Sequence, residues 1–139
     1  MVKLIIVSHG TLAEGLMNAM ELIVGPQPEV VALRLEEADS IDGLESQVEA
    51  AVQARQAGQE VLILVDLFGA SPFNVSSRVA MRHAKIDVIT GVNLPMLLET
   101  ALGREYMSLV ELVKVAREAG AGSVKVLSDL LQAGDQTPA

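Results

Sequence analysis

The sequence predicts an α/β domain with an open, mostly parallel β-sheet that helices flank on both faces. Short apolar runs alternate with longer stretches of helical spacing, which is the element order of a parallel sheet with crossover helices. The chain has 139 residues, of which 50% are hydrophobic and 20% are charged, which suits one folded domain. We expect that domain over residues 1–130 and a flexible tail over residues 131–139.

Four short apolar runs predict the strands of this sheet. Each run is rich in aliphatic and β-branched residues, which is typical of parallel strands that are buried on both faces. A fifth candidate strand, Val124–Leu127, follows the glycines at positions 120 and 122. The four strands are expected at Leu4–Ser8, Val30–Leu35, Val61–Val65 and Ile86–Thr90.

The stretches between these runs have the spacing of amphipathic helices. In the first stretch, Leu12, Leu16 and Ile23 recur at helical intervals. Asp39 or Ser40 is suited to cap the second helix, because short polar side chains accept hydrogen bonds from first-turn amides. The expected helices are Thr11–Val24, Asp39 or Ser40 to about Ala57, Pro72 or Phe73 to about Arg82, Pro95–Leu102, and Ser108–Ala119.

The charge balance and the residue types exclude several classes of protein. With 10 Lys and Arg against 18 Asp and Glu, the formal net charge is −8. A nucleic-acid-binding surface needs a basic stripe, so no nucleic-acid partner is expected. The chain has no cysteine, which excludes disulfides and thiolate catalysis. No apolar run approaches the roughly 18 residues of a membrane span, and we expect a cytoplasmic protein.

The carboxyl ends of the predicted strands bring three loops together, at 8–10, 66–72 and 91–93, where ligands of such sheets bind. His9 ends the first strand and Asp66 follows the third, and these two strands are commonly neighbours. A carboxylate that accepts a hydrogen bond from Nδ1–H of His9 fixes the tautomer of the ring and leaves the Nε2 lone pair free. Taken singly, His9 also suits a strand-closing hydrogen bond, and Asp66 a helix or turn cap.

Two predicted helix N-termini, at Thr11 and near Ser71, point toward the same place, and Gly10 leaves room beside the imidazole. Free amides and helix dipoles favour an anion there, typically phosphate. Ser71 adds a hydroxyl, although Ser71-Pro72 is also typical of an N-cap before a first-turn proline. The chain has no glycine-rich loop with lysine, which favours a phosphohistidine over a bound nucleotide. His83 is expected on the surface at a helix end, and no metal site is expected.

Three motifs carry a resemblance to a known family. They are Ile-Val-Ser-His-Gly at 6–10, Leu-Val-Asp-Leu-Phe-Gly-Ala-Ser-Pro-Phe-Asn at 64–74, and Gly-Val-Asn-Leu-Pro-Met-Leu-Leu-Glu at 91–99. In this order they resemble the mannose-family enzyme IIA domain, a phosphocarrier component of the bacterial sugar phosphotransferase system. The resemblance extends over about residues 1–130.

The resemblance implies a role for each candidate residue. His9 matches the histidine that accepts a phosphoryl group on Nε2 from the phosphohistidine of HPr and passes it to a IIB protein. Asp66 matches the carboxylate that orients this histidine. Ser71, with Gly10 and Thr11, falls in the loops that hold the phosphoryl oxygens. The sugar itself is bound by the membrane subunits IIC and IID, so the resemblance implies no particular sugar and no cofactor.

The resemblance also implies a homodimer, in which strand Val124–Leu127 crosses to the partner's sheet as its antiparallel edge. IIB is expected to be a separate chain. We also expect this protein to contact the membrane only through the permease. One departure from the family pattern is Ala70, where family members often have a second glycine before Ser-Pro. An alanine at that position is strained if the backbone there needs a positive φ.

Three other classes of protein share part of this pattern. A response-regulator receiver also has an aspartate after its third strand, but it needs an acidic pair where this chain has Ser8-His9. A tetrapyrrole metal chelatase also begins with a strand and His-Gly, but it usually has a second histidine in its site, and His83 is badly placed. The phosphocarrier subunit of dihydroxyacetone kinase shares the fold and the histidine. The Ser-Pro-Phe-Asn and Asn-Leu-Pro-Met stretches favour the sugar-transport branch.

Overall fold

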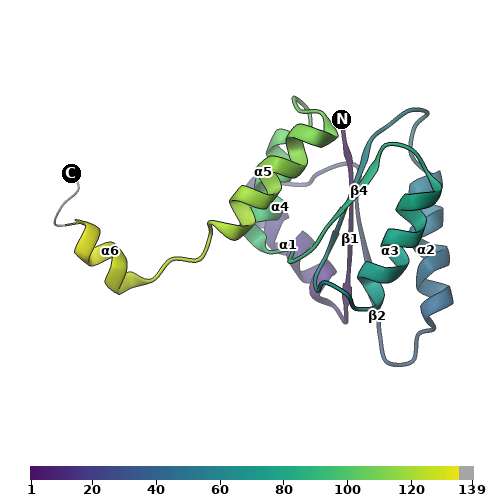
Figure 1. The fold of residues 1–139 in the computed structure, drawn as a ribbon, viewed down its shortest axis with the longest axis horizontal. Helices are drawn as coiled ribbons and strands as arrows, with labels where there is room; N and C mark the ends of the chain where they lie inside the picture. The colour runs from purple at the N-terminus through teal and green to yellow at the C-terminus, as the bar shows by residue number, and fades with distance from the viewer. Residues whose placement is uncertain (135–139) are drawn as a thin grey trace.

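The sheet is parallel and has four strands in the order β2-β1-β3-β4. The computed structural model describes residues 1–134, and Figure 1 shows the sheet between two groups of helices. Because the strands are parallel, their carboxyl ends all lie at one edge of the sheet. The strands are β1 (Lys3–His9), β2 (Val30–Leu35), β3 (Val61–Val65) and β4 (Ile86–Ile89).

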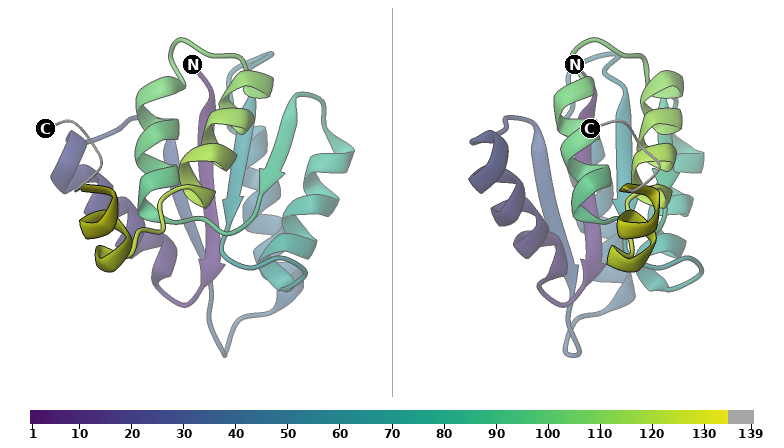
Figure 2. Two further views of the ribbon diagram at one scale, coloured as in Figure 1. Left: turned by 60° about the vertical axis from the view of Figure 1, so that its left-hand side comes forward. Right: turned by 90° about the vertical axis from the view of Figure 1, so that its left-hand side faces the viewer.

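Helices cover both faces of the sheet (Figures 1 and 2). α1, α4 and α5 pack on one face, and α2 and α3 pack on the other, each group over its own apolar cluster. The predicted class, an α/β sheet flanked on both faces, is therefore confirmed. The helices are α1 (Leu12–Val24), α2 (Ile41–Gln53), α3 (Ser71–Arg82), α4 (Leu94–Gly103), α5 (Leu109–Ala121) and α6 (Leu127–Gly134).

β3 explains why the central strands are apolar at every position. Leu62 and Leu64 face the α1/α4/α5 layer, whereas Ile63 faces the α2/α3 layer, and all five residues of the strand are fully buried. A strand covered on both sides has no solvent face on which a polar residue is favoured. β1 lies between β2 and β3, which confirms the predicted adjacency of the first and third strands.

Side-chain caps define where three of the helices begin. Ser40 accepts a hydrogen bond from the amide of Gly43 at the start of α2, and Asn93 accepts one from the amide of Met96 at the start of α4. Ser108 caps α5 as part of a capping box. α2 ends at Gln53 rather than near the predicted Ala57, because the chain leaves the helix in a turn before Gly58, whose φ is 75°.

The predicted fifth strand is wrong for the single chain. Residues 124–126 form no regular structure, and Leu127 begins α6. We call residues 123–134 the arm, and Figure 1 shows it extending away from the sheet. The β-branched pattern at Val124 and Val126 favours a strand locally, but a strand forms only where a neighbouring strand supplies hydrogen bonds.

The arm also changes the predicted boundary of the tail. α6 includes residues 131–134, which were expected to be flexible. Leu127, Leu130 and Leu131 lie at helical spacing, and all three are exposed. The remaining part of the predicted tail, residues 135–139, lies outside the described residues.

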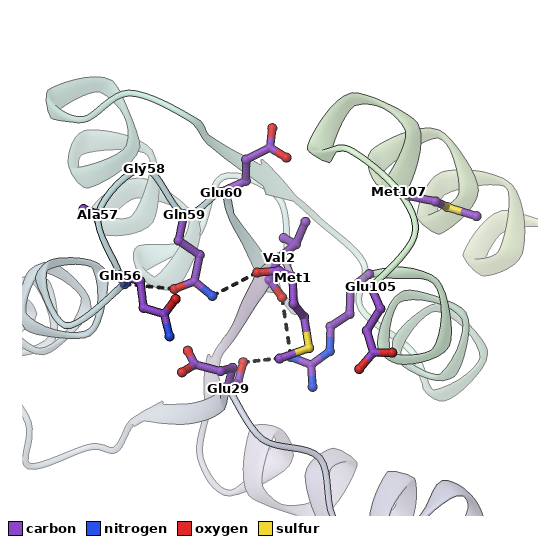
Figure 3. Close-up of a pocket in the computed structure, with 11 residues that line it drawn as sticks. Met1, Val2, Glu29, Gln56, Ala57, Gly58, Gln59, Glu60, Glu105 and Met107 are labelled. Atoms are coloured by element: carbon purple, nitrogen blue, oxygen red, sulfur yellow. Dashed lines mark hydrogen bonds between the residues drawn. The ribbon is translucent and has the colours of Figure 1, made fainter.

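A buried arginine holds together the end of the molecule opposite the strands' carboxyl ends. Arg104 follows α4, is 1% exposed, and lines a cavity of about 330 Å³ (Figure 3). Its guanidinium donates hydrogen bonds to the carbonyls of Val2, Pro28 and Glu29 and to the side chain of Gln27. Burial lowers the pKa of Arg104. One side chain thus joins the start of β1 to the loop between α1 and β2.

Replacing this arginine with methionine is expected to lower the free energy of unfolding by about 2–3 kcal/mol. Arg104→Met keeps the aliphatic volume but removes the hydrogen bonds to the carbonyls of Val2, Pro28 and Glu29, of which only Glu29 keeps another donor shown in the structure, the amide of Leu4. Urea unfolding measures the loss. Arg34→Met is the control, because Arg34 is exposed and its partners within residues 1–134 are Glu14 and Glu36, so its loss is expected to be under about 1 kcal/mol. Equal losses in the two variants would contradict the anchoring role of Arg104.

Candidate functional site at the carboxyl ends of the strands

His9 and Asp66 form a hydrogen-bonded pair at the carboxyl ends of β1 and β3. Nδ1 of His9 lies 2.8 Å from Oδ2 of Asp66, and the same oxygen accepts the backbone N–H of His9 at 2.9 Å. The Asp66 side chain is 12% exposed and the His9 side chain is 47% exposed. An ionised carboxylate only accepts hydrogen bonds, so Nδ1 carries the proton and Nε2 the lone pair. Among residues 1–134 no hydrogen-bond partner occupies Nε2.

The segment after His9 turns sharply into α1. Gly10 has a φ of 53°, a backbone conformation that favours glycine, and its N–H donates to the carbonyl of Leu35 at 2.8 Å. Gly10 therefore allows the chain to turn after His9, and its N–H is already bonded to the carbonyl of Leu35. Ser8 is fully buried, and its hydroxyl accepts the amide of Ala13 at 2.8 Å. Thr11 occupies the N-cap position of α1, and its side chain makes no capping hydrogen bond.

The loop between β3 and α3 shows whether the backbone at Ala70 has the positive φ that would strain an alanine. Ala70 has φ −88° and ψ 175°, which is extended backbone that any residue adopts, so alanine is unstrained there. The positive φ of this loop, 80°, falls on Gly69. Ala70 is also the N-cap of α3, so the possible N-cap role of Ser71 is wrong. Ser71 is the first helical residue, and its hydroxyl has no hydrogen-bond partner among residues 1–134.

A cavity of about 260 Å³ lies beside the pair and is lined by both His9 and Ser71. The far side of this cavity is acidic, a feature that the sequence reasoning did not place in the site. Glu36, Glu37 and Asp39 line it from the loop after β2. The residue pattern gave no signal for this, because it follows from the pairing of β2 with β1, which places the loop after β2 next to His9.

The third predicted loop does not join the site around His9. The amide of Val92 donates to the carbonyl of Val65, and Asn93 faces the end of α5. Nδ2 of Asn93 donates to the carbonyl of Gly120 at 3.1 Å and lies 3.4 Å from the hydroxyl of Ser123. This loop therefore holds the root of the arm.

His83 lies at the opposite end of α3 from Ser71, at the C-cap. Its Nε2 is 2.5 Å from a carboxylate oxygen of Glu49 on α2. The side chain is 25% exposed, so the predicted surface position at a helix end is borne out in part. The two histidines occupy different ends of the molecule and form no common site.

Ion pairs join α2 to α3 and lower the pKa of a carboxyl on α2. Hydrogen bonds from Arg78 and Arg82 hold the pKa of Glu45 below its ordinary value. A carboxyl whose pKa is lowered on folding stabilises the protein above its unfolded-state pKa and loses that contribution as the pH falls through the folded-state pKa. Glu45 thus stabilises the fold above about pH 4.3.

Glu45→Gln is expected to lower the free energy of unfolding at neutral pH and to match the parent protein near pH 3, below about 4.3. Urea unfolding at the two pH values measures the difference. Glu21→Gln, on the exposed side of α1, is the control for the loss of a surface carboxylate that has no ion pair among residues 1–134. A Glu45→Gln deficit that is the same at both pH values would rule out the ion pairs as its cause.

No group of three or more His, Cys, Asp or Glu residues within 1–134 is arranged to hold a metal ion. No helix in the same range is long and apolar enough to cross a membrane.

Comparisons with known proteins agree with this geometry. A family model described as "PTS system fructose IIA component" matches residues 3–117. The chain is 35% identical over 127 residues to the "PTS system mannose-specific EIIAB component" of Escherichia coli K12, a match that covers 91% of this chain. It is 30% identical to the "PTS system fructose-specific EIIA component" of Bacillus subtilis, covering 95% of this chain and 90% of that protein.

Solved structures agree with the sequence matches. The phosphotransferase system component EIIA from Streptococcus agalactiae aligns with a TM-score of 0.87 at 32% identity, covering 93% of this chain and 99% of that one. The chain spans only 39% of the length of the Escherichia coli EIIAB component. With a family match over most of its length and relatives that are 30% and 35% identical, the chain belongs to the mannose-type EIIA family of the phosphotransferase system.

Proposed function

We propose that this protein is a phosphocarrier of the sugar phosphotransferase system. Nε2 of His9 accepts a phosphoryl group from the phosphohistidine of HPr and passes it to a IIB component. The observation that carries this proposal is the 2.8 Å contact between Nδ1 of His9 and Asp66, because it leaves the other ring nitrogen exposed as the nucleophile. Family membership supports it, since relatives are named as EIIA components.

Asp66 holds His9 in the reactive tautomer and balances its charge. In the transfer, the P–N bond of the donor breaks as the bond from phosphorus to Nε2 forms, and the electron pair of the broken bond stays on the donor's imidazole. Nδ1 of His9 keeps its proton, so the phosphorylated ring gains positive character. The adjacent carboxylate stabilises that character, as in other His–carboxylate pairs. The second contact of Oδ2, to the backbone N–H of His9, fixes the direction of the ring.

The start of α3 supplies the donors for the phosphoryl oxygens. α3 has no side-chain cap, so the amides of its first turn and the hydroxyl of Ser71 remain for an anion. Thr11, at the N-cap of α1, adds a hydroxyl that makes no capping hydrogen bond, while the amide of Ala13 in the first turn of α1 is already bonded to Ser8. Fixed backbone dipoles of this kind stabilise charge that develops during transfer. Because a phosphoryl group already on nitrogen needs mainly positioning, we propose no metal or nucleotide for this step.

The proposal is tested by reconstituting the transfer. The protein is incubated with phosphoenolpyruvate, enzyme I and HPr, and the incorporated phosphate is characterised. We expect one phosphate per chain that is labile in acid and stable in base, as a phosphohistidine is, and its loss when a cognate IIB is added. A protein that takes up no phosphate from phospho-HPr would overturn the proposal.

We also propose that two copies exchange their arms. β4 is an edge strand in the described chain, so one side of it is unpaired, and an unpaired edge favours pairing with another strand. The arm carries exposed apolar side chains that have no place to pack on their own body, among them Val124 at 81% exposure. Cavities along both sides of β4, of about 330 and 440 Å³, leave room for an added strand.

The side-chain pattern of the two segments specifies one antiparallel register. On β4, Ile86 and Val88 face the α2/α3 layer, and the exposed Asp87 between them faces the α5 side. In the arm, Val124 and Val126 alternate with Lys125. Placing Lys125 of one copy opposite Asp87 of the other pairs opposite charges and sets the valines of the arm beside Val88 and Ile86. Residues directly opposite in an antiparallel pair share a face of the sheet.

Reversing either charge is expected to weaken the dimer about tenfold or more, because each dimer contains the contact twice. Asp87→Lys places two lysines opposite each other, and Lys125→Asp places two aspartates. The double variant restores opposite charges and is expected to restore the dimer, which sedimentation equilibrium measures. A double variant that dimerises no better than the weaker single variant would rule out this register.

The proposed place of action follows from the proposed partners. A carrier between HPr and IIB works in the cytoplasm and meets the membrane only through the permease subunits IIC and IID. The comparisons favour this interpretation over the receiver, chelatase and dihydroxyacetone-kinase alternatives, because the relatives are named as sugar phosphotransferase components.

A further inference from the structure

The cavity beside His9 has one acidic side. Its volume is about 260 Å³, and His9 and Ser71 line it where the phosphoryl group is proposed to sit. Three carboxylates from the loop between β2 and α2 line the other side, and no Lys or Arg of residues 1–134 is among the lining residues. We call these carboxylates the acidic wall, which consists of Glu36, Glu37 and Asp39.

Two of the three carboxylates have partners in the folded chain. Oδ2 of Asp39 accepts the N–H of Glu36 at 2.8 Å, and the N–H of Asp39 donates to the carbonyl of Glu36 at 2.9 Å. Nε of Arg34 lies 3.4 Å from Oε1 of Glu36. Asp39 therefore shapes the loop, and Glu36 is paired with an arginine. The start of the loop is also fixed beside the site, because the carbonyl of Leu35 accepts the N–H of Gly10.

Glu37 differs from the other two carboxylates of the wall. Its side chain is exposed, and no hydrogen bond or ion pair joins it to another residue within 1–134. An unpaired carboxylate presents its whole charge to whatever enters the cavity that it lines. The group proposed to enter from His9 is a phosphoryl group, which is also negative, so the two repel each other.

We infer that the acidic wall, through Glu37 above all, raises the free energy of phosphorylated His9, so that the protein passes the phosphoryl group on rather than retaining it. The inference rests on the proposed phosphocarrier function and deepens it, by naming a residue that sets how firmly the group is held. The first-turn amides of α3 and the hydroxyl of Ser71 hold the phosphoryl oxygens, and the wall opposes them. A carrier that held the group too firmly would not release it to the next protein.

The equilibrium of transfer between phospho-HPr and His9 measures this balance. The P–N bond of the donor breaks as the bond from phosphorus to Nε2 forms, and Nδ1 of His9 keeps its proton. The equilibrium constant between the free proteins therefore reports how firmly each holds the group, whatever the rate or the affinity of their encounter. Across a cavity of about 260 Å³, the two charges lie within the screening length of about 10 Å at 0.1 M salt.

The test changes the charge at position 37 in two steps. Glu37→Gln removes one negative charge, and Glu37→Lys also adds a positive one, and neither change touches the hydrogen bonds that shape the loop. We expect the equilibrium constant for phosphorylation of the protein to rise about threefold in Glu37→Gln and about tenfold in Glu37→Lys. Each protein is mixed with an equal amount of phospho-HPr, and the acid-labile phosphate on both proteins is measured once transfer has reached equilibrium.

The matched controls are Glu21→Gln and Glu21→Lys, since Glu21 is exposed near the C-terminal end of α1, away from His9. They change the net charge by the same amounts and are expected to match the parent protein. Salt provides a readout that a purely structural role would not move. Between about 0.01 M and about 1 M salt the screening length falls from about 30 Å to about 3 Å, so the gain in Glu37→Lys is expected to shrink.

Three results would contradict these expectations in different ways. Equal equilibrium constants at low salt for the parent protein, Glu37→Gln and Glu37→Lys would overturn the inference and leave the phosphocarrier function standing. A gain in Glu37→Lys that persists undiminished at high salt, or that Glu21→Lys shows equally, would also overturn the role of the wall. A parent protein that accepts no phosphate from phospho-HPr would instead overturn the proposed function.

Discussion

Replacing His9 with glutamine is expected to abolish phosphate uptake completely. Glutamine keeps a hydrogen-bond donor for Asp66, so the loop has no reason to rearrange, but its amide nitrogen has no available lone pair to attack phosphorus. The variant is incubated with phosphoenolpyruvate, enzyme I and HPr, and acid-labile phosphate is measured. The chain has no cysteine that could serve as an alternative acceptor.

The other histidine provides the control. His83 is bonded to Glu49 at the far end of α3, so His83→Gln is expected to take up phosphate like the parent protein. Acid-labile phosphate that persists in His9→Gln would remove His9 from the mechanism. A complete loss of phosphate uptake in His83→Gln, with His9 intact, would also contradict the assignment of His9 as the phosphorylated residue.

Replacing Asp66 with asparagine is expected to slow transfer by about ten- to a hundredfold, less than the roughly 10⁴-fold effect of the corresponding change in a serine-protease triad. Asparagine keeps the shape but removes the charge that stabilises the phosphorylated ring. Its amide can also turn nitrogen toward Nδ1 and favour the wrong tautomer. The rate of phosphate exchange with phospho-HPr measures the effect, and circular dichroism checks that the variant is folded.

One further measurement separates the orientation of His9 from the folding of the loop in this variant. Oδ2 of Asp66 also accepts the backbone N–H of His9, so part of any loss of stability comes from the loop. Urea unfolding quantifies that part. A folded Asp66→Asn protein that exchanges phosphate at the parental rate would leave Asp66 only as an anchor of the loop after β3.

The strands and the paired residues could be predicted from sequence because their causes are local or topological. Runs such as Val61–Val65 are apolar at every position only when both faces are covered. In a parallel sheet the carboxyl ends of the strands lie at the same edge. The closeness of His9 and Asp66 therefore follows from the adjacency of β1 and β3. The structure adds the 2.8 Å contact between them, which no sequence pattern specifies.

The features that sequence could not predict depend on distant parts of the chain or on backbone angles. Val124–Leu127 has the composition of a strand, but the single chain offers it no neighbour. The extended conformation of Ala70 is a property of the loop, not of its residue type. The acidic loop after β2 lines the site only because β2 lies beside β1, an order that the residue pattern alone leaves open.

The most direct test of the central claim is to identify the atom that carries the phosphoryl group. The protein is labelled with ¹⁵N in its histidines, phosphorylated through HPr, and examined by ³¹P and ¹⁵N nuclear magnetic resonance. Because Asp66 holds Nδ1 of His9, the account predicts a single phosphorus signal coupled to Nε2 of His9. Phosphorus bonded to Nδ1 of His9, or to any nitrogen of His83, would contradict it.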